Sequence, residues 1–238
     1  MSKHSKRYDS PTEKWGIPTK ESHWAPKPSG GSHPADRSVP LVVVIRDILA
    51  YTNTSREAKR VLADRKVEVD GKIVTDKNRP VGLMDIVSIP DLMENYRALF
   101  DQKGKIRLKE IDESETGWKL VKIEDKTTLK SGITQYNLHD GRNLREEDSK
   151  AYETNDVLKL EIPSQKVLDS YEFKDGMMAL ITGGKHIGEI DTIEEREIVK
   201  GSQPNFVHFE SGITTIEDYV FVIGKEMPVI EIPEVGIV

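Results

Sequence analysis

The sequence of 238 residues has no cysteine and few aromatic residues, which make up 6% of the chain. The absence of cysteine excludes disulfide bonds, a thiol nucleophile and Cys-ligated zinc. No apolar run approaches the roughly 20 residues of a transmembrane helix, and the polar N-terminus lacks the apolar segment of a signal peptide. We therefore expect a cytoplasmic protein with no membrane partner.

Recognisable catalytic motifs are also missing. The six histidines are scattered, so they predict no metal site, and Gly183-Gly184 is not followed by the GKS or GKT of a phosphate-binding loop. Neighbouring residues of a strand point to opposite faces, so His139 and Asp140 do not indicate a catalytic pair, and Asp140-Gly141 is typical of a hairpin turn. The sequence predicts no enzyme, no cofactor and no small-molecule substrate.

Charge is distributed unevenly along the chain, whose formal net charge is -6. Residues 1–90 hold 16 Lys and Arg against 11 Asp and Glu, whereas residues 91–238 hold 19 against 30. Fields beyond about 10 Å are largely screened at moderate salt, so a local basic surface suffices to bind nucleic acid. Any such surface is expected within the first 90 residues.

Residues 54–76 have the pattern of a helix followed by a hairpin. Thr54 and Glu57 form a capping box, and Asp70-Gly71 is a dipeptide that tight hairpin turns prefer. One side of the predicted helix is basic at spacings of three and four residues, through Arg56, Lys59 and Arg60. This pattern fits a clamp for a nucleic-acid backbone, and it also fits an ordinary solvated helix face.

The first 38 residues are predicted to form an extended arm with little regular structure, because proline and glycine interrupt them. Basic and aromatic residues alternate in this arm. Aromatic side chains here could stack on RNA bases, or the arm could wrap its own domain with tryptophans filling surface grooves. The candidate RNA-binding residues of the arm are Lys6, Arg7, Trp15, Lys20 and Trp24.

Elsewhere the sequence predicts one more helix and many strands. Apolar residues at helical spacing predict a helix over 39–51, and residues 91–100 fit a short amphipathic connector. Short apolar runs separated by glycine indicate mostly strand over 101–173 and further strands at 206–209 and 219–224. The small cores that this pattern allows favour several domains over one.

Three segments resemble known protein families. SREAKRVL followed by VEVDGK resembles the S4-type RNA-binding module, in which the positions of Ser55, Arg56, Lys59, Arg60 and Lys72 would face RNA. The arm KRYDSPTEKWGIPTKESHWAPKPSGGSHP before VPLVVVIRDIL is similar to the start of the archaeal and eukaryotic ribosomal protein S4e family. DGMMALITGGKHIGEIDTI resembles the KOW motif of small SH3-like barrels, with Lys185 at its loop tip.

The resemblance implies an α+β multidomain protein. Its parts would be an extended basic arm (1–38), a helix-helix-hairpin RNA-binding module of the S4 type (39–90), a β-rich central domain (91–172) and an SH3-like KOW β-barrel with C-terminal strands (173–238). The implied function is that of a structural constituent of the cytoplasmic ribosome, bound to small-subunit rRNA and neighbouring small-subunit proteins. An RNA-modifying enzyme and a transient RNA-binding factor are the alternatives, although no Arg-Leu-Asp signature of a pseudouridine synthase follows the module.

Overall fold

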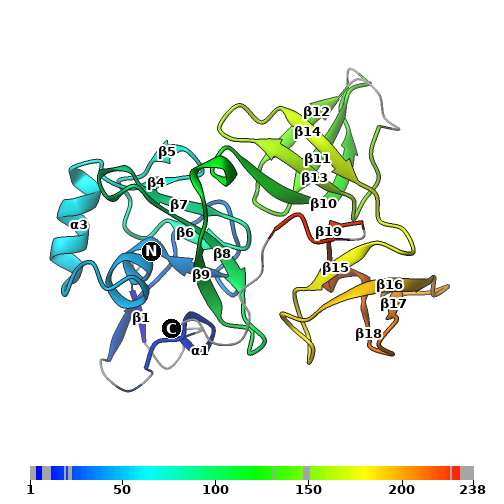
Figure 1. Ribbon diagram of the computed structural model, residues 1–238, viewed down its shortest axis with the longest axis horizontal. Helices are drawn as coiled ribbons and strands as arrows, with labels where there is room; N and C mark the ends of the chain where they lie inside the picture. Colours follow the sequence, from blue (N-terminus) through cyan, green and yellow to red (C-terminus); the bar gives the residue numbers. More distant parts are fainter. Residues whose placement is uncertain are drawn as a thin grey trace. The chain divides into compact units, whose positions relative to one another are not determined.

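The computed structural model describes residues 4–6, 12–18, 20, 23–130, 132–146, 151–225 and 227–230. It is mostly β-sheet with few helices, as the sequence predicts, and divides into two compact units (Figure 1). Unit 1 comprises Met1–Leu99, Lys105–Lys119 and Ile162–Ser164, and unit 2 comprises Phe100–Gly104, Leu120–Glu161 and Gln165–Val238. No helix in the described part of the chain is long and apolar enough to cross a membrane.

The helices of unit 1 are short. The predicted helix over 39–51 is wrong at both ends: it consists of α2 (Leu41–Val43) and a π-helical continuation, η2 (Val44–Ile48). Its expected first turn is instead a strand, because Ser38–Pro40 (β3) pairs with Pro80–Gly82 (β6). The remaining helices of unit 1 are α1 (Thr12–Trp15), α3 (Ser55–Ala63), and the 3-10 turns η3 (Pro90–Leu92) and η4 (Glu113–Glu115).

A five-stranded sheet forms the body of unit 1, in the order β5-β4-β7-β8-β9. The expectation of an amphipathic connector over 91–100 is wrong, because Glu94–Phe100 is a strand, β8, which pairs with β7 and has four buried residues. The strands are β4 (Glu68–Val69), β5 (Lys72–Ile73), β7 (Ile86–Ile89), β8 (Glu94–Phe100) and β9 (Ile106–Glu110).

The arm has more regular structure than its prolines suggest. His4–Lys6 (β1) and Trp24–Pro26 (β2) form a two-stranded ribbon, and α1 lies between them in sequence. The stretch after β2 is hydrogen-bonded to the loop before β6, since the Ser29 amide donates to the Asn78 carbonyl at 2.8 Å. The prediction of an arm with little regular structure is therefore wrong for these segments, because backbone pairing outweighs the local preference of proline.

The capping box and the hairpin turn that the sequence predicts are both confirmed. The Thr54 hydroxyl accepts a hydrogen bond from the Glu57 amide, and the Glu57 carboxylate caps the Thr54 amide in return. Asp70 and Gly71 have φ values of 51° and 66°, the positive values that a type I′ turn requires at both central positions. β4 and β5 pair across this turn.

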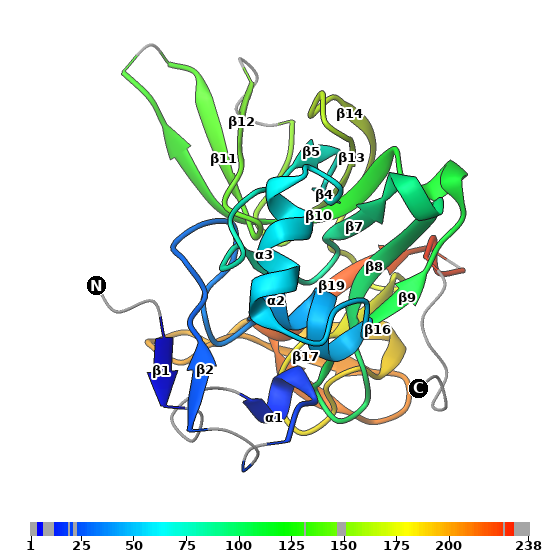
Figure 2. The ribbon, with the colours of Figure 1, turned by 90° about the vertical axis from the view of Figure 1, so that its left-hand side faces the viewer.

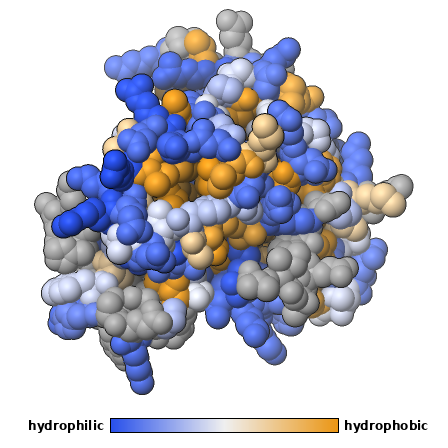
Figure 3. All heavy atoms as spheres, turned by 60° about the vertical axis from the view of Figure 1, so that its left-hand side comes forward, coloured by the Kyte–Doolittle hydropathy of each residue, from blue (hydrophilic) through white to orange (hydrophobic). Residues whose placement is uncertain are grey.

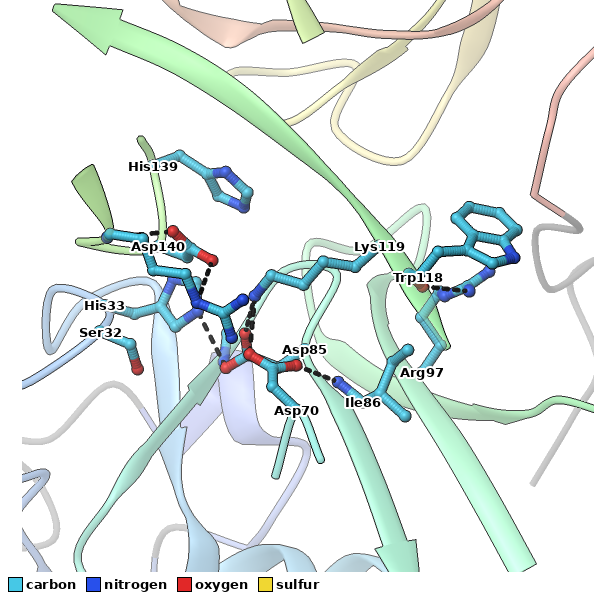
Figure 4. Close-up of polar contacts among 12 residues, drawn as sticks. Ser32, His33, Asp70, Asp85, Ile86, Arg97, Trp118, Lys119, His139 and Asp140 are labelled. Atoms are coloured by element: carbon cyan, nitrogen blue, oxygen red, sulfur yellow. Dashed lines mark hydrogen bonds and ion pairs between the residues drawn. The ribbon is translucent and has the colours of Figure 1, made fainter. Parts of the chain in front are cut away.

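A buried group of charges lies beneath the hairpin (Figure 4). The Lys119 ammonium, fully buried, donates to Asp70 at 2.8 Å and to Asp85 at 2.9 Å. His33 from the arm contacts the other oxygen of Asp85 at 2.9 Å, and the Gly82 amide donates to that oxygen. Although burial alone would raise it, the charges of His33 and Lys119 hold the pKa of Asp85 below its ordinary value. This network connects the arm, the hairpin turn, the start of β7 and the beginning of β10.

Unit 2 contains two five-stranded sheets, in the orders β12-β11-β10-β13-β14 and β18-β17-β16-β15-β19. The predicted turn at Asp140-Gly141 is confirmed, since it joins β11 to β12 and the Gly141 amide donates to Leu138. Within unit 2 the Lys122 ammonium donates to the carbonyls of Glu217, Asp218 and Val220. The strands and remaining turn are β10 (Trp118–Thr128), β11 (Thr134–Leu138), β12 (Asn143–Glu146), β13 (Val157–Glu161), β14 (Val167–Tyr171), β15 (Met178–Ile181), β16 (Ile190–Glu197), β17 (Phe206–Phe209), β18 (Thr214–Ile216), η5 (Glu217–Tyr219) and β19 (Val220–Gly224).

Replacing Lys119 with Met should strongly destabilise unit 1, because it leaves two buried carboxylates without their cation. Breaking a buried ion pair in this way costs about 3 to 5 kcal/mol. Urea unfolding followed by tryptophan fluorescence reports on this unit, since all three tryptophans lie within it. The control is Lys66→Met, which breaks the exposed pair with Asp91 and should change stability little. Equal effects of the two variants would contradict a structural role of the network.

The same network predicts acid sensitivity. The pKa of Asp85 is lowered in the folded state, so its contribution to stability is complete above its unfolded pKa of about 3.9 and is lost as the pH falls below that value. Asp85→Asn should therefore lower stability at pH 7 and flatten the loss of stability between pH 5 and pH 2.5. A steep, unchanged acid profile in this variant, measured by urea unfolding at each pH, would refute the assignment.

Candidate nucleic-acid interface

Helix α3 has a buried apolar face and an exposed basic face. Ala58 and Leu62 are buried, and α3 contacts α2 and η2. Arg56, Lys59 and Arg60 are exposed, and no described residue forms an ion pair or hydrogen bond with their side chains. Three long cations without carboxylate partners on one helix face can each reach a phosphate.

The hairpin that follows α3 adds a further cation. Lys72 is exposed on β5, directly after the Asp70-Gly71 turn. Ser55, at the first position of α3, is partly buried, and its hydroxyl accepts a hydrogen bond from the Lys77 ammonium at 3.2 Å. The structure therefore brings together Ser55 and the basic residues of α3, and Lys72 is carried by the hairpin that follows them.

Lys77 is absent from the residues that the sequence singles out. It lies in the loop before β6, where the Val42 amide donates to its carbonyl and the Leu41 amide donates to that of Arg79. These two bonds to the start of α2 bring the loop to the N-terminal end of α3. No local pattern reveals this, because the contact joins residues 22 positions apart.

The predicted residues of the arm have different environments. Trp24 is 53% exposed, packs edge to face against His23, and lies opposite the exposed Lys6 in the β1–β2 ribbon. Lys20 is exposed as well, whereas Arg7 lies outside the described residues. An indole that is about half exposed can stack on a base.

Trp15 does not fit the predicted RNA-stacking role. Its side chain is only 1% exposed, and its indole N–H donates to the Ser38 carbonyl at 2.9 Å. Of the two roles that the sequence allows, this tryptophan takes the internal one: it fills the core of its own unit, because an apolar ring gains more from burial than from exposure to water.

In unit 2, Lys185 is exposed in the loop between β15 and β16. Gly184 has a φ of 82°, and the backbone at Gly183 passes so close to the Tyr219 ring that a Cβ there would lie 2.6 Å from it. Both glycines are therefore required for this loop shape, as the sequence suggests. His186 contacts Glu189 at 3.1 Å, whereas the neighbouring Lys185 is exposed.

The surface in Figure 3 carries mostly hydrophilic side chains, with hydrophobic groups exposed between them. Among the described residues, no cluster of His, Asp and Glu side chains could hold a metal ion. The chemistry of this candidate interface is therefore that of cations, hydroxyl groups and one exposed indole. These groups can bind a polymer that carries negative charges and aromatic bases, which is a nucleic acid.

Two family models match the chain. The Ribosomal family S4e model matches residues 92–167, and the S4 domain model matches residues 40–87, which include α3 and the hairpin. Small ribosomal subunit protein eS4 of Methanothermobacter thermautotrophicus is 44% identical over 235 residues, which cover 97% of this chain and 96% of the relative. The chain belongs to the ribosomal S4e family.

Further members of the S4e family agree with this assignment. Small ribosomal subunit protein eS4 of Methanosphaera stadtmanae is 46% identical over 233 residues, covering 97% of this chain and 95% of the relative. The crystal structure of the 30S ribosomal protein S4e from Thermoplasma acidophilum matches with a TM-score of 0.70 at 36% identity, over 80% of this chain and 96% of that chain. The resemblance to the S4e family that the sequence indicates is thereby confirmed.

Replacing Arg56 and Arg60 with Ala should weaken binding to small-subunit rRNA. The slope of log affinity against log salt should fall by about 0.7 to 0.9 for each lost phosphate contact. Filter binding of the full chain across a KCl series measures this slope. The matched control is Lys166→Ala with Lys200→Ala, which removes two exposed cations of unit 2. An unchanged slope in the α3 variant would remove Arg56 and Arg60 from the interface.

Proposed function

We propose that this protein is a structural constituent of the small ribosomal subunit that binds rRNA and supports subunit assembly and translation. The observation that carries the proposal is the exposed basic face of α3, with its hairpin lysine, inside the segment that matches the S4 domain. Similarity to small-subunit proteins along nearly the whole chain supports it.

The proposed binding mechanism follows from the charge of these side chains and from the shape of folded RNA. Arg56, Lys59, Arg60 and Lys72 neutralise phosphates and release condensed counterions, which drives association at low salt. Recognition depends mainly on the shape of folded RNA, since A-form grooves hide most base edges from side chains. Trp24 on the arm ribbon adds a stacking surface for an unpaired base.

The proposal extends to the parts of the chain. Residues 39–90 act as a helix-helix-hairpin RNA-binding module of the S4 type, preceded by the basic arm of residues 1–38. Residues 91–172 form the β-rich central domain. Residues 173–238 form an SH3-like KOW barrel, which is supported by the five-stranded sheet around β15 and by the glycine loop that carries Lys185.

The protein acts without catalysis in this proposal. It takes no cofactor and no small-molecule substrate, and its partners are small-subunit rRNA and neighbouring small-subunit proteins of the cytoplasmic ribosome. The support is that the described polar side chains of the interface are cations and hydroxyls on the surface, not a group of acid, base and nucleophile enclosed in a pocket.

Sucrose-gradient sedimentation of a cell extract after a high-salt wash tests the proposed function. The chain should remain with the small subunit in stoichiometric amounts, because many separate contacts hold it there. A variant with Arg56, Lys59 and Arg60 replaced by Gln should be recovered on fewer subunits, while the wild-type chain serves as the reference in the same extract.

Two other results would each support a competing function. Quantitative release of the wild-type chain by the salt wash would favour a transient RNA-binding factor. Sedimentation of the chain with free tRNA and soluble enzymes would favour an RNA-modifying enzyme that uses the S4-type module for targeting. Either result would overturn the ribosomal assignment.

A further inference from the structure

The side chain of Ser55 has a partner inside the protein. Its hydroxyl accepts a hydrogen bond from the Lys77 ammonium at 3.2 Å, and both residues are half-buried. The sequence pattern places Ser55 among the residues that face RNA, together with four cations. The structure distinguishes Ser55 from those cations, because it is the residue that holds a lysine from another part of the chain.

Lys77 keeps its positive charge in this contact. A hydroxyl is neutral, and within the described residues the Ser55 hydroxyl is the acceptor of the Lys77 ammonium, with no ion pair beside it. The adjacent acid, Asp76, binds other groups: its carboxylate accepts the Ser29 hydroxyl and the Asn78 amide, each at 3.0 Å. Since an ammonium has three donors, Lys77 can bind a further acceptor while it contacts Ser55.

The loop that carries Lys77 is held by its backbone. The Val42 amide, at the start of α2, donates to the Lys77 carbonyl at 2.8 Å, and the Ser29 amide donates to the Asn78 carbonyl at 2.8 Å. These bonds fix the backbone on both sides of the Lys77 side chain. The hydrogen bond with Ser55 therefore has only one flexible side chain to orient.

This hydrogen bond brings Lys77 to the basic face of α3. Residues four apart share one face of a helix, so Ser55 lies one turn before Lys59. The Lys77 ammonium therefore lies at the N-terminal end of the row of exposed cations, which consists of Arg56, Lys59 and Arg60. Clustered like charges favour an anionic partner.

The acid in the first turn of α3 projects in a different direction. At 3.6 residues per turn, Glu57 lies about 200° around the helix from Ser55. Its carboxylate accepts the Asn53 amide at 2.9 Å and the Thr54 amide at 3.3 Å. Glu57 thus caps the helix on one side, while Ser55 and Lys77 lie on the other.

We propose that Lys77 contacts an RNA phosphate at the N-terminal end of α3, and that Ser55 is a positioning residue, which orients the Lys77 ammonium without touching RNA. The proposal rests on the proposed function and deepens it, because it adds one phosphate contact and gives Ser55 a role of its own. The ligand is the sugar-phosphate backbone, since a lysine ammonium binds phosphate as a point charge.

Filter binding of full-chain variants to small-subunit rRNA transcribed in vitro, across a KCl series, tests both roles. Lys77→Gln should lower the slope of log affinity against log salt by about 0.7 to 0.9, the value for one lost phosphate contact. Ser55→Ala removes one hydrogen bond and no charge, so it should weaken binding about two- to tenfold with the slope unchanged. The double variant S55A/K77Q should bind as K77Q does, because Ser55 acts only through Lys77.

Lys126 provides the matched control. It is also half-buried, and its ammonium donates to a neutral oxygen, the Tyr152 carbonyl, at 2.9 Å. Lys126→Gln in unit 2 should leave the affinity and the slope of the wild type unchanged. Lys77→Arg, which keeps the charge at the loop, should retain the wild-type slope, and a reduced slope in this variant would contradict the phosphate contact.

Different outcomes separate this inference from the proposed function. A wild-type slope in K77Q with a reduced slope in R56A/R60A would overturn the inference and leave the proposed function intact. Wild-type slopes in both variants would overturn both. A wild-type affinity of S55A would overturn the positioning role, and so would an equal loss from S55A in the wild type and in K77Q, because Ser55 would then act independently of Lys77.

Urea unfolding by tryptophan fluorescence separates binding from folding. Both side chains lie at the surface end of α3, so K77Q and S55A should unfold at nearly the wild-type urea concentration. If K77Q unfolded early and K77R had the same reduced affinity as K77Q, Lys77 would serve the fold alone and the phosphate contact would be refuted.

Discussion

The structure of unit 1 depends on one buried cation, the ammonium group of Lys119. It lies between Asp70 and Asp85 at hydrogen-bonding distance, and Asp85 in turn contacts His33. Desolvating charges is unfavourable, so such a group survives in a core only where the charges pair and their remaining lone pairs are satisfied. Here backbone amides do this: the Ile86 amide donates to Asp70 and the Gly82 amide to Asp85. Four distant segments are fixed at once, and the absence of a side chain at Gly82 leaves the room that the His33 ring occupies.

This network holds the hairpin that carries Lys72 in place. Asp70 both forms the hairpin turn and accepts the Lys119 ammonium, so the strand that carries Lys72 cannot slide without exposing a buried charge. Helix α3 is fixed at its start by the capping box and along its side by the burial of Ala58 and Leu62. A backbone fixed in this way would need no further ordering on binding, so the remaining entropic cost would be that of the long basic side chains.

Sequence patterns predict the local features of the fold well and the distant contacts poorly. The capping box at Thr54, the turn at Asp70-Gly71 and the glycine loop before Lys185 each depend on residues within a few positions, and each is present. The strand at β3 and the burial of Trp15 depend on partners about 20 to 40 residues away, which no local period encodes. Lys119 and Asp70 are 49 positions apart in the sequence, so no local pattern predicts that they form an ion pair.

The charges of unit 2 restrict how this part of the chain can meet RNA. Along β16, the exposed residues Glu194, Glu195 and Glu197 form an acidic row, whereas Lys185 stands in the loop that precedes the strand. Under the proposed function, a phosphate backbone would be repelled by the acids of this strand and attracted by Lys185, so electrostatics favours the loop over β16 as a contact. A net negative charge is therefore compatible with the proposed RNA binding, because attraction can be concentrated in a few basic places while repulsion elsewhere disfavours the wrong orientations.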